Sequence, residues 1–282
     1  MYKILKKIEL APAVKLINIY SPIIAQKAKA GQFVILRVNE KGERIPLTIA
    51  DSNPSLGYIT IVFQEVGKTT KLLGRLQEGD EVLDLVGPLG NPSEIENYGN
   101  IVGVGGGVGI AALYPILKAL KEKGNYIISI LGARSKNYLI FKEEIKKISD
   151  EIYLATDDGS LGHKGFVSDV LKSLLESGKK IDRIWAIGPT IMMKVISELT
   201  KPYKIPTIVS LNPIMVDGTG MCGGCRVTVG NKTMFTCVDG PEFDGHLVNF
   251  DELLLRLKTY KEEEQLSLRL LEESEGYKIG HK

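Results

Sequence analysis

The chain has 282 residues, of which 44% are hydrophobic and 25% charged, and its formal net charge is +2. Because a domain commonly holds about 150 residues, this length predicts two domains, and the composition excludes a disordered chain. The lysines and arginines are spread along the sequence. Together with the small net charge, this excludes nucleic acid and an anionic membrane surface as partners.

The three cysteines all fall between residues 222 and 237. Such an odd number cannot form a fully paired disulfide framework and favours a metal site in a reducing compartment. The first residues lack the apolar stretch of a signal peptide, so we expect a cytoplasmic protein. The longest apolar run, residues 101–117, is interrupted by glycines and Pro115, which predicts strand, turn and helix rather than a membrane span.

From Tyr2 to about Gly90 the sequence consists of short β-rich segments, such as residues 33–38 and 58–63, separated by turn residues. This pattern predicts an antiparallel β-barrel or sandwich. Proline, serine and asparagine cluster in residues 92–100, where we place the domain boundary.

Beyond about Asn100, short apolar strands alternate with helical patterns, which predicts βαβ units and an α/β domain with a parallel sheet. The predicted strands are residues 101–104, 126–131, 152–156, 184–187 and 207–211, and the predicted helices are residues 110–123, 141–149, 167–176 and 190–200. Near the end, Phe250, Leu253, Leu254 and Leu257 recur at helical spacing and predict a helix with one apolar stripe.

The most specific motif is D-x4-C-x2-C-x11-C, formed by Asp217, Cys222, Cys225 and Cys237. Plant-type [2Fe–2S] loops have the spacing C-x4-C-x2-C with a more distant fourth cysteine, so Asp217 occupies the first ligand position. Thiolates bind iron–sulfur clusters or zinc, and a carboxylate oxygen can also bind iron. The alternatives are a structural zinc site and reduced core cysteines. Zinc sites usually have two close Cys or His pairs, whereas this stretch has one.

A glycine-rich run lies between a predicted strand and a predicted helix, and it consists of Gly105, Gly106, Gly107, Val108 and Gly109. Glycines at such a turn let a pyrophosphate approach the backbone N–H groups and the positive end of the helix. Gly188, Pro189 and Met192 follow another strand and predict a second loop at the same edge of the sheet. The alternative is that the glycines serve tight turns only.

The β-rich part contributes two weaker motifs, Arg44, Pro46, Leu47 and Thr48 in the first and Gly67, Lys68, Thr69 and Thr70 in the second. The Thr48 hydroxyl can hydrogen-bond a flavin ring, and Gly67 with Lys68 can hold a phosphate. Taken alone, each motif is more often a turn or a solvated charge.

In this order, these motifs resemble the ferredoxin–NADP reductase superfamily from about Tyr2 to Gly245. Within it the chain is most similar to the electron-transfer subunits of dihydroorotate dehydrogenase B and to the small subunits of NADH-dependent ferredoxin:NADP oxidoreductase, also called sulfide dehydrogenase. Asp217 in the first ligand position is similar to the second branch. The superfamily's arginine lies three residues before its Ser or Thr, a position held here by Ile45, so Thr48 matches the pattern and Arg44 departs from it.

The resemblance implies an FAD-binding β-barrel in residues 1–98, an NAD(P)-binding α/β domain in 99–211 and a [2Fe–2S] subdomain in 212–245. For residues 246–282 we expect a helical tail that docks on a partner through its apolar stripe, and the alternative is that the stripe packs on the chain's own nucleotide domain. The resemblance also implies nucleotide contacts at Asp157 and Asp158, and NAD(H) as the nicotinamide. Local chemistry favours NADP(H) instead, because Arg134 follows its strand with no acid to bind a ribose hydroxyl.

The implied function is electron transfer between NAD(H), a bound FAD and the [2Fe–2S] cluster, with hydride transfer at the flavin and no catalytic acid–base residue. The implied partner is a larger flavin- and iron–sulfur-containing subunit of an electron-bifurcating heterodimer, through which ferredoxin and NADP(H) react. Two alternatives remain, the dihydroorotate dehydrogenase B pair and a zinc-stabilised, non-catalytic nucleotide-binding module.

Overall fold

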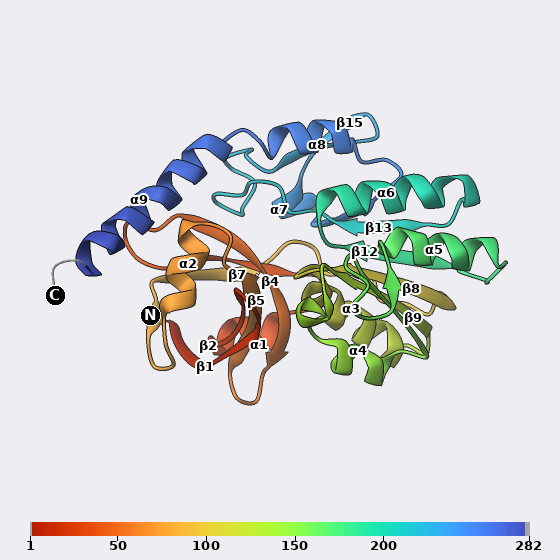
Figure 1. The fold of residues 1–282 in the computed structure, drawn as a ribbon, viewed down its shortest axis with the longest axis horizontal. Coiled ribbons are helices and arrows are strands. Elements are labelled where there is room, and N and C mark those ends of the chain that lie inside the picture. Colours follow the sequence, from red (N-terminus) through yellow and green to blue (C-terminus); the bar gives the residue numbers. More distant parts are fainter. Residues whose placement is uncertain (1, 280–282) are drawn as a thin grey trace.

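The computed structural model describes the backbone of residues 2–279 and the side chains as far as Ser274. An N-terminal barrel and a parallel sheet with its helices lie side by side, and the C-terminal segment passes over both of them (Figure 1). Helix α9 (Lys261–Ile279) near the C-terminus packs against α2 (Lys68–Arg75) in the N-terminal part of the chain.

The barrel is an antiparallel sheet of seven strands in the order β6-β1-β2-β5-β4-β3-β7. Its strands are β1 (Tyr2–Ala11), β2 (Val14–Tyr20), β3 (Phe33–Arg37), β4 (Arg44–Asn53), β5 (Tyr58–Gln64), β6 (Glu81–Val82) and β7 (Asp84–Leu89), with the helices α1 (Pro22–Lys27) and α2 (Lys68–Arg75). Residues 59–63 of β5 are all buried, because one face of this central strand lies against the barrel core and its opposite face is also covered by packed residues. The predicted antiparallel barrel is confirmed in outline.

The second sheet has the order β11-β10-β9-β8-β12-β13-β16, and all its pairs are parallel except β13 with β16. Its strands are β8 (Asn100–Gly106), β9 (Tyr126–Ala133), β10 (Glu151–Thr156), β11 (His163–Lys164), β12 (Arg183–Ile187), β13 (Thr207–Ser210) and β16 (Glu242–Asp244). Its helices are α3 (Gly109–Glu122), η1 (Lys136–Tyr138), α4 (Lys142–Ile148), α5 (Val167–Glu176), α6 (Thr190–Thr200) and η2 (Lys201–Tyr203). The predicted parallel sheet is present, and the strand order reverses between β8 and β12, where open α/β sheets bind ligands.

The cysteine-rich segment forms a small hairpin of β14 (Arg226–Val229) and β15 (Lys232–Phe235), followed by the short helix α7 (Thr236–Asp239). The chain then enters β16, which pairs Val209 of β13 with Phe243. The cluster segment is thus joined to the parallel sheet at both of its ends, because it leaves from β13 and returns beside it.

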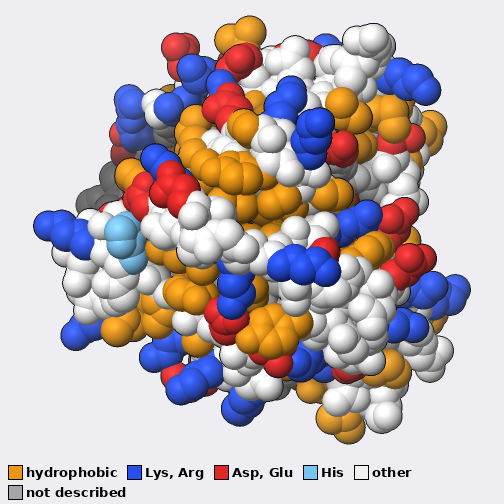
Figure 2. Space-filling model, turned by 90° about the vertical axis from the view of Figure 1, so that its right-hand side faces the viewer, with side chains coloured by type: hydrophobic (Ala, Val, Ile, Leu, Met, Phe, Trp, Pro, Cys, Tyr) orange, Lys and Arg blue, Asp and Glu red, His pale blue; other side chains and the backbone are white. Residues whose placement is uncertain are grey.

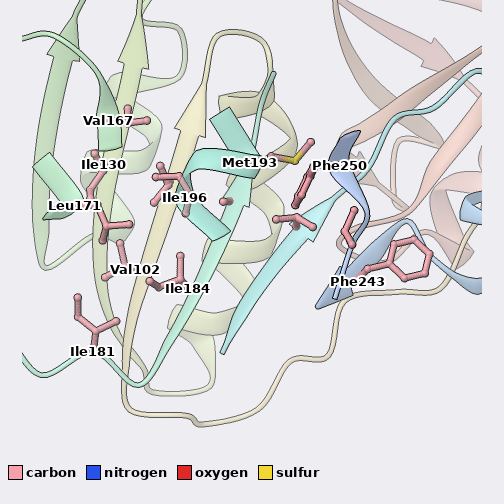
Figure 3. Close-up of a cluster of buried hydrophobic side chains, with 14 of the residues drawn as sticks. Val102, Ile130, Val167, Leu171, Ile181, Ile184, Met193, Ile196, Phe243 and Phe250 are labelled. Atoms are coloured by element: carbon pink, nitrogen blue, oxygen red, sulfur yellow. The ribbon is translucent and has the colours of Figure 1, made fainter. Parts of the chain in front are cut away.

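Two helices follow, α8 (Phe250–Arg256) and α9 (Lys261–Ile279). Phe250 and Leu253 of α8 are 6% and 1% exposed, in one cluster with Met193 and Ile196 of α6. Figure 3 shows Phe250 beside Met193 at the edge of this core. Phe250 and Leu253 of the apolar stripe therefore pack on the chain's own nucleotide domain, as the alternative to partner docking predicts, while Leu254 and Leu257 are only half-buried. Without the tail, this apolar side of α6 would face solvent. The chain buries it under its own helix α8.

The surface is mixed in character, and Figure 2 shows one face on which apolar side chains gather in the middle with Lys, Arg, Asp and Glu around them. Within residues 2–279, no helix is both long and apolar enough to cross a membrane.

Candidate functional site

A cavity of about 1030 Å³ lies between the barrel and the parallel sheet. This is the size of a pocket for a large organic cofactor. The sequence-predicted residues that line it are Pro46, Leu47, Thr48, Thr70, Gly106, Gly107, Val108, Gly109, Arg134, Asp157, Gly188, Pro189 and Met192. The structure thus brings motifs from both domains to one site, although Pro46 and Met192 lie about 150 residues apart in the sequence.

The glycine loops after β8 and β12 pack against each other at the point where the strand order reverses. A Cβ on Gly109 would lie 2.4 Å from the carbonyl oxygen of Ile187, and one on Gly106 would lie 2.5 Å from Sδ of Met192. Gly107 differs, because its φ is +56° and a Cβ there would meet nothing within 4 Å. Two of the glycines therefore permit close packing of the loops, and Gly107 leaves its backbone open to the cavity.

Loops after β9 and β10 supply polar groups to the part of the cavity that lies against the parallel sheet. Arg134 and Asp157 line the cavity, and the Arg134 guanidinium lies 6.0 Å from the centre of the Tyr138 ring. Asp158 does not line it. The hydroxyl and backbone N–H of Ser160 hold the pKa of Asp158 below its ordinary value, and the N–H donates to Oδ1 at 2.9 Å. Asp158 therefore organises a turn rather than contacting the cavity.

In the two barrel motifs, too, some of the predicted residues line the cavity and others do not. Thr48 lines the cavity opposite Phe33, its partner across β3 and β4, whereas Arg44 is exposed at the start of β4 and does not line it. Thr70 lines the cavity while its Oγ1 accepts the N–H of Gly67 at 3.0 Å, which caps α2. The other three predicted residues, Gly67, Lys68 and Thr69, lie outside the cavity wall, as does Gly105.

Several cavity residues lie outside the predicted motifs: Phe33, Gln64, Tyr138, Phe166, Ser210, Asn212 and Met215. One signal existed for Phe33, because an aromatic residue faces Thr48 once β3 and β4 are paired. The others come from different strands, helices and loops and acquire a common position only after folding. Met215 and Asn212 matter most, because they extend the cavity to the segment that leads into Asp217.

The proposed metal ligands form two pairs. The Sγ atoms of Cys225 and Cys237 are 3.2 Å apart and both residues are buried, while Sγ of the exposed Cys222 lies 3.4 Å from Oδ1 of Asp217. Among the described residues, no three His, Cys, Asp or Glu side chains are grouped as they would be around one metal ion. Two separate pairs suit a two-iron cluster, in which each iron takes two protein ligands, better than a single tetrahedral zinc.

The surroundings of this loop also fit a bound cluster. In the part of the chain that the structure describes, two buried side-chain polar atoms have no hydrogen-bond partner, Oγ1 of Thr236 and Nε of Arg256. Thr236 precedes Cys237, and Arg256 contacts Gly224 in the loop. Buried donors rarely lack acceptors, so their gathering here fits sulfur acceptors that the polypeptide does not supply.

Electrostatics separate the two pairs of ligands. Backbone N–H groups, first that of Thr219, hold the pKa of Asp217 below its ordinary value. Burial, with the neighbouring Cys225, raises the pKa of Cys237 to about 12. Without a metal this thiol stays protonated at neutral pH, whereas a bound metal deprotonates a coordinating thiol.

Comparisons with known proteins agree with this geometry. Residues 212–249 match the family model described as the iron–sulfur cluster binding domain of dihydroorotate dehydrogenase B. A dihydroorotate dehydrogenase B (NAD(+)) electron transfer subunit homolog from Thermotoga maritima is 57% identical over 265 residues, covering 94% of this chain and 93% of that protein. The electron transfer subunit from Geobacillus thermodenitrificans is 35% identical over 78% of this chain and 87% of that protein.

Among solved structures, a chain of the NADH-dependent reduced ferredoxin–NADP oxidoreductase, studied for flavin-based electron bifurcation, matches with a TM-score of 0.91 and 55% identity over 96% of this chain and 98% of that one. A ferredoxin–NADP⁺ reductase from Neisseria gonorrhoeae shares the fold alone, with a TM-score of 0.59 and 20% identity over 72% of this chain and 90% of that one. The resemblance noted in the sequence is confirmed: this chain belongs to the family of dihydroorotate dehydrogenase B electron transfer subunits and has the ferredoxin–NADP reductase fold.

Proposed function

We propose that the chain is the FAD- and [2Fe–2S]-carrying subunit of an electron-bifurcating, NADH-dependent ferredoxin:NADP oxidoreductase. One observation supports this most directly. A single cavity of about 1030 Å³ is lined by the barrel motif, by both glycine loops and by Met215, which lies two residues before Asp217. A flavin and a nicotinamide held there would adjoin the cluster loop, so the site forms a path for electrons.

The flavin supplies the exchange between two-electron hydride transfer and single-electron transfer. The protein's part is to bind and orient. Thr48 would present its hydroxyl to a flavin ring, and Gly107 would present its open backbone to a phosphate near the N-terminal end of α3. Apolar side chains of the cavity wall, among them Leu47 and Met192, would pack against the bound groups and keep water from them. No acid–base residue is needed for this chemistry.

For the nicotinamide we propose NAD(H), following the solved relative, which is named an NADH-dependent oxidoreductase. Arg134 and Asp157 both line the nucleotide side of the cavity. The Asp157 carboxylate accepts hydrogen bonds from ribose hydroxyls and repels a 2′-phosphate, which offsets the attraction that Arg134 would give to NADP(H).

The partner we propose is a larger flavin- and iron–sulfur-containing subunit, with ferredoxin and NADP(H) reacting there. The relatives are named electron transfer subunits, and this name means that they act together with another subunit. The name of these relatives also favours a second candidate function, the transfer of electrons from dihydroorotate. The two candidate functions differ in the large subunit, whereas the electron path through this chain is the same in both.

The decisive experiment begins with the absorption spectrum and the iron, flavin and zinc contents of the purified protein, followed by anaerobic addition of NADH or NADPH. We expect flavin and cluster bands, faster reduction by NADH, and an EPR signal from the reduced cluster. Stoichiometric zinc without iron would favour the zinc-stabilised module instead. The natural complex, purified through this chain, should reduce ferredoxin and NADP⁺ rather than oxidise dihydroorotate.

A further inference from the structure

The tail of the chain returns to the cluster loop through one side chain. Arg256, the last residue of α8, donates from Nη2 to the carbonyl oxygen of Gly224 at 3.1 Å. Gly224 lies between Cys222 and Cys225 in the sequence. A guanidinium is therefore held against the short segment that carries two of the proposed ligands.

The helix that presents this guanidinium is firmly anchored. Its apolar side, with Phe250 and Leu253, is buried in the core of the parallel sheet. At its start, the Asn249 side chain accepts the N–H of Glu252 at 3.1 Å, and the Asn249 N–H donates to the Thr228 carbonyl of β14 at 2.9 Å. Arg256 thus projects from an element fixed both to the sheet and to the cluster segment.

The surroundings of Arg256 differ from those of the other arginine at this loop. Arg226 donates from Nη1 to the Gly223 carbonyl at 3.1 Å, but it is exposed. Arg256 is half-buried, and its Nε is buried without a partner among the described residues. Both side chains carry a guanidinium charge, but solvent screens the exposed one far more strongly.

We propose that Arg256 is a positioning residue for the cluster and that its fixed positive charge raises the reduction potential of the cluster. Reduction adds one negative charge to the cluster, and a nearby, poorly screened cation stabilises that charge. The Leu257 side chain, next in the sequence, lines the nucleotide cavity. One helix end therefore touches both ends of the electron path. The inference rests on the proposed [2Fe–2S] site.

The test is an EPR-monitored redox titration of the full chain with R256Q, R256K and, as the matched control, R226Q. Glutamine keeps a donor for the Gly224 carbonyl but has no charge, and lysine keeps the charge. We expect R256Q to shift the cluster to a more negative potential by about 59 mV, a tenfold change in the one-electron equilibrium constant. R256K should stay near the wild-type value, and R226Q should shift less than R256Q. FAD content should be unchanged throughout.

An unshifted R256Q, an equal shift in R226Q, or a shift in R256K as large as that in R256Q would each overturn the role of this charge. Should R256Q fail to retain iron, R256K decides, because a wild-type potential supports the proposal and a large negative shift contradicts it. A wild-type protein without iron would contradict the proposed function, whereas iron with an unshifted R256Q contradicts this inference alone.

Discussion

The Asp217 carboxylate has two proposed roles, as an iron ligand and as an acceptor that orders the loop. A substitution series separates these two roles. The carboxylate accepts the backbone N–H groups of Met221 at 3.0 Å and Cys222 at 2.9 Å, and it lies beside the Cys222 thiol. We expect D217A to lose most of the cluster because both roles vanish, whereas D217C supplies a thiolate at the same position and keeps the cluster. Iron content and the reduced-state EPR spectrum measure this.

The matched control is D239A. Asp239 also accepts a backbone N–H in this segment, from Phe235 at 2.6 Å, but it is not a predicted ligand. Iron content in D239A should therefore equal that of the wild type. If D217A also kept its iron and an unaltered EPR spectrum, Asp217 would not be a ligand.

Glu242 is a half-buried residue whose carboxyl joins three segments. It accepts the Ser93 hydroxyl at 2.6 Å and the Trp185 ring N–H at 3.2 Å. Burial raises the pKa of Glu242 above the ordinary value. Its protonated form therefore contributes stability that is fully present below the ordinary glutamate pKa and is lost as the pH rises through the raised one. Urea unfolding across this range should show it in the wild type.

The variant E242Q imitates the protonated carboxyl and should remove this pH dependence, which for one proton is at most about 1.4 kcal/mol per pH unit. The exposed neighbour Glu94 provides the control, and E94Q should follow the wild-type curve. Equal slopes in E242Q and the wild type would mean that Glu242 ionises normally in the folded protein.

A functional residue can be predicted from the sequence when the residues it acts with lie close to it in the chain. The ligand spacing from Asp217 to Cys237 is local, so the four candidates could be selected without a structure. Arg256 could not, because its contact with Gly224 spans 32 residues and depends on how α8 packs. Arg44 and Lys68 illustrate the reverse case, in which suitable residue types in a suitable motif lie outside the cavity wall.

At the scale of elements, α8 is the clearest test of the packing described above. Leu253 is 1% exposed and Leu255, on the same helix, is 68% exposed. We expect L253A to lower the free energy of unfolding by about 2 to 5 kcal/mol, the usual cost of a cavity in a core. L255A should change it by no more than about 0.5 kcal/mol. Urea denaturation of both variants provides the measurement, and similar values would place α8 outside the core.

The helices and strands themselves were largely predictable, because each has the period of its structure in the sequence. Residues 167–176 and 190–200 form helices with the predicted bounds. The surface that covers an apolar stripe was not predictable. Phe250 and Leu253 would give the same pattern whether they faced a partner or α6, since periodicity identifies an apolar side but not its neighbour.

Helix α9 is the part of the tail that still suits a partner. It packs on α2, where Lys71 contacts Glu272 at 2.5 Å, but Leu266 and Leu270 are 51% and 55% exposed. We expect truncation after Thr259 to leave FAD and iron bound, because α8 remains, and to weaken retention of the larger subunit. Co-purification through a tag on either subunit measures this.

A double substitution, L266S with L270S, should weaken retention in the same direction, whereas L255S on α8 should not. A truncated chain that held its partner as well as the full chain does would remove α9 from the interface. Truncation at Gly245 is a poorer experiment, because it also deletes the buried residues of α8 and exposes the core.

The predicted pattern changes near Asn100 from short β-rich segments to alternating strands and helices. The division into a barrel and a parallel sheet could therefore be predicted in outline. The cavity between them could not, because it depends on how two separately patterned domains face each other. The return of the chain into β16 was equally hidden, since a strand of three residues is too short to show a period.

That return has a kinetic consequence. With β13 and β16 paired on either side of it, the cluster segment cannot swing as a tethered carrier between flavin and acceptor. Electron delivery through this chain would then be limited by tunnelling across a fixed gap rather than by diffusive rotation. The intramolecular rate, followed by rapid mixing, should stay constant as glycerol raises the solvent viscosity; a rate that falls in inverse proportion would reveal a moving segment.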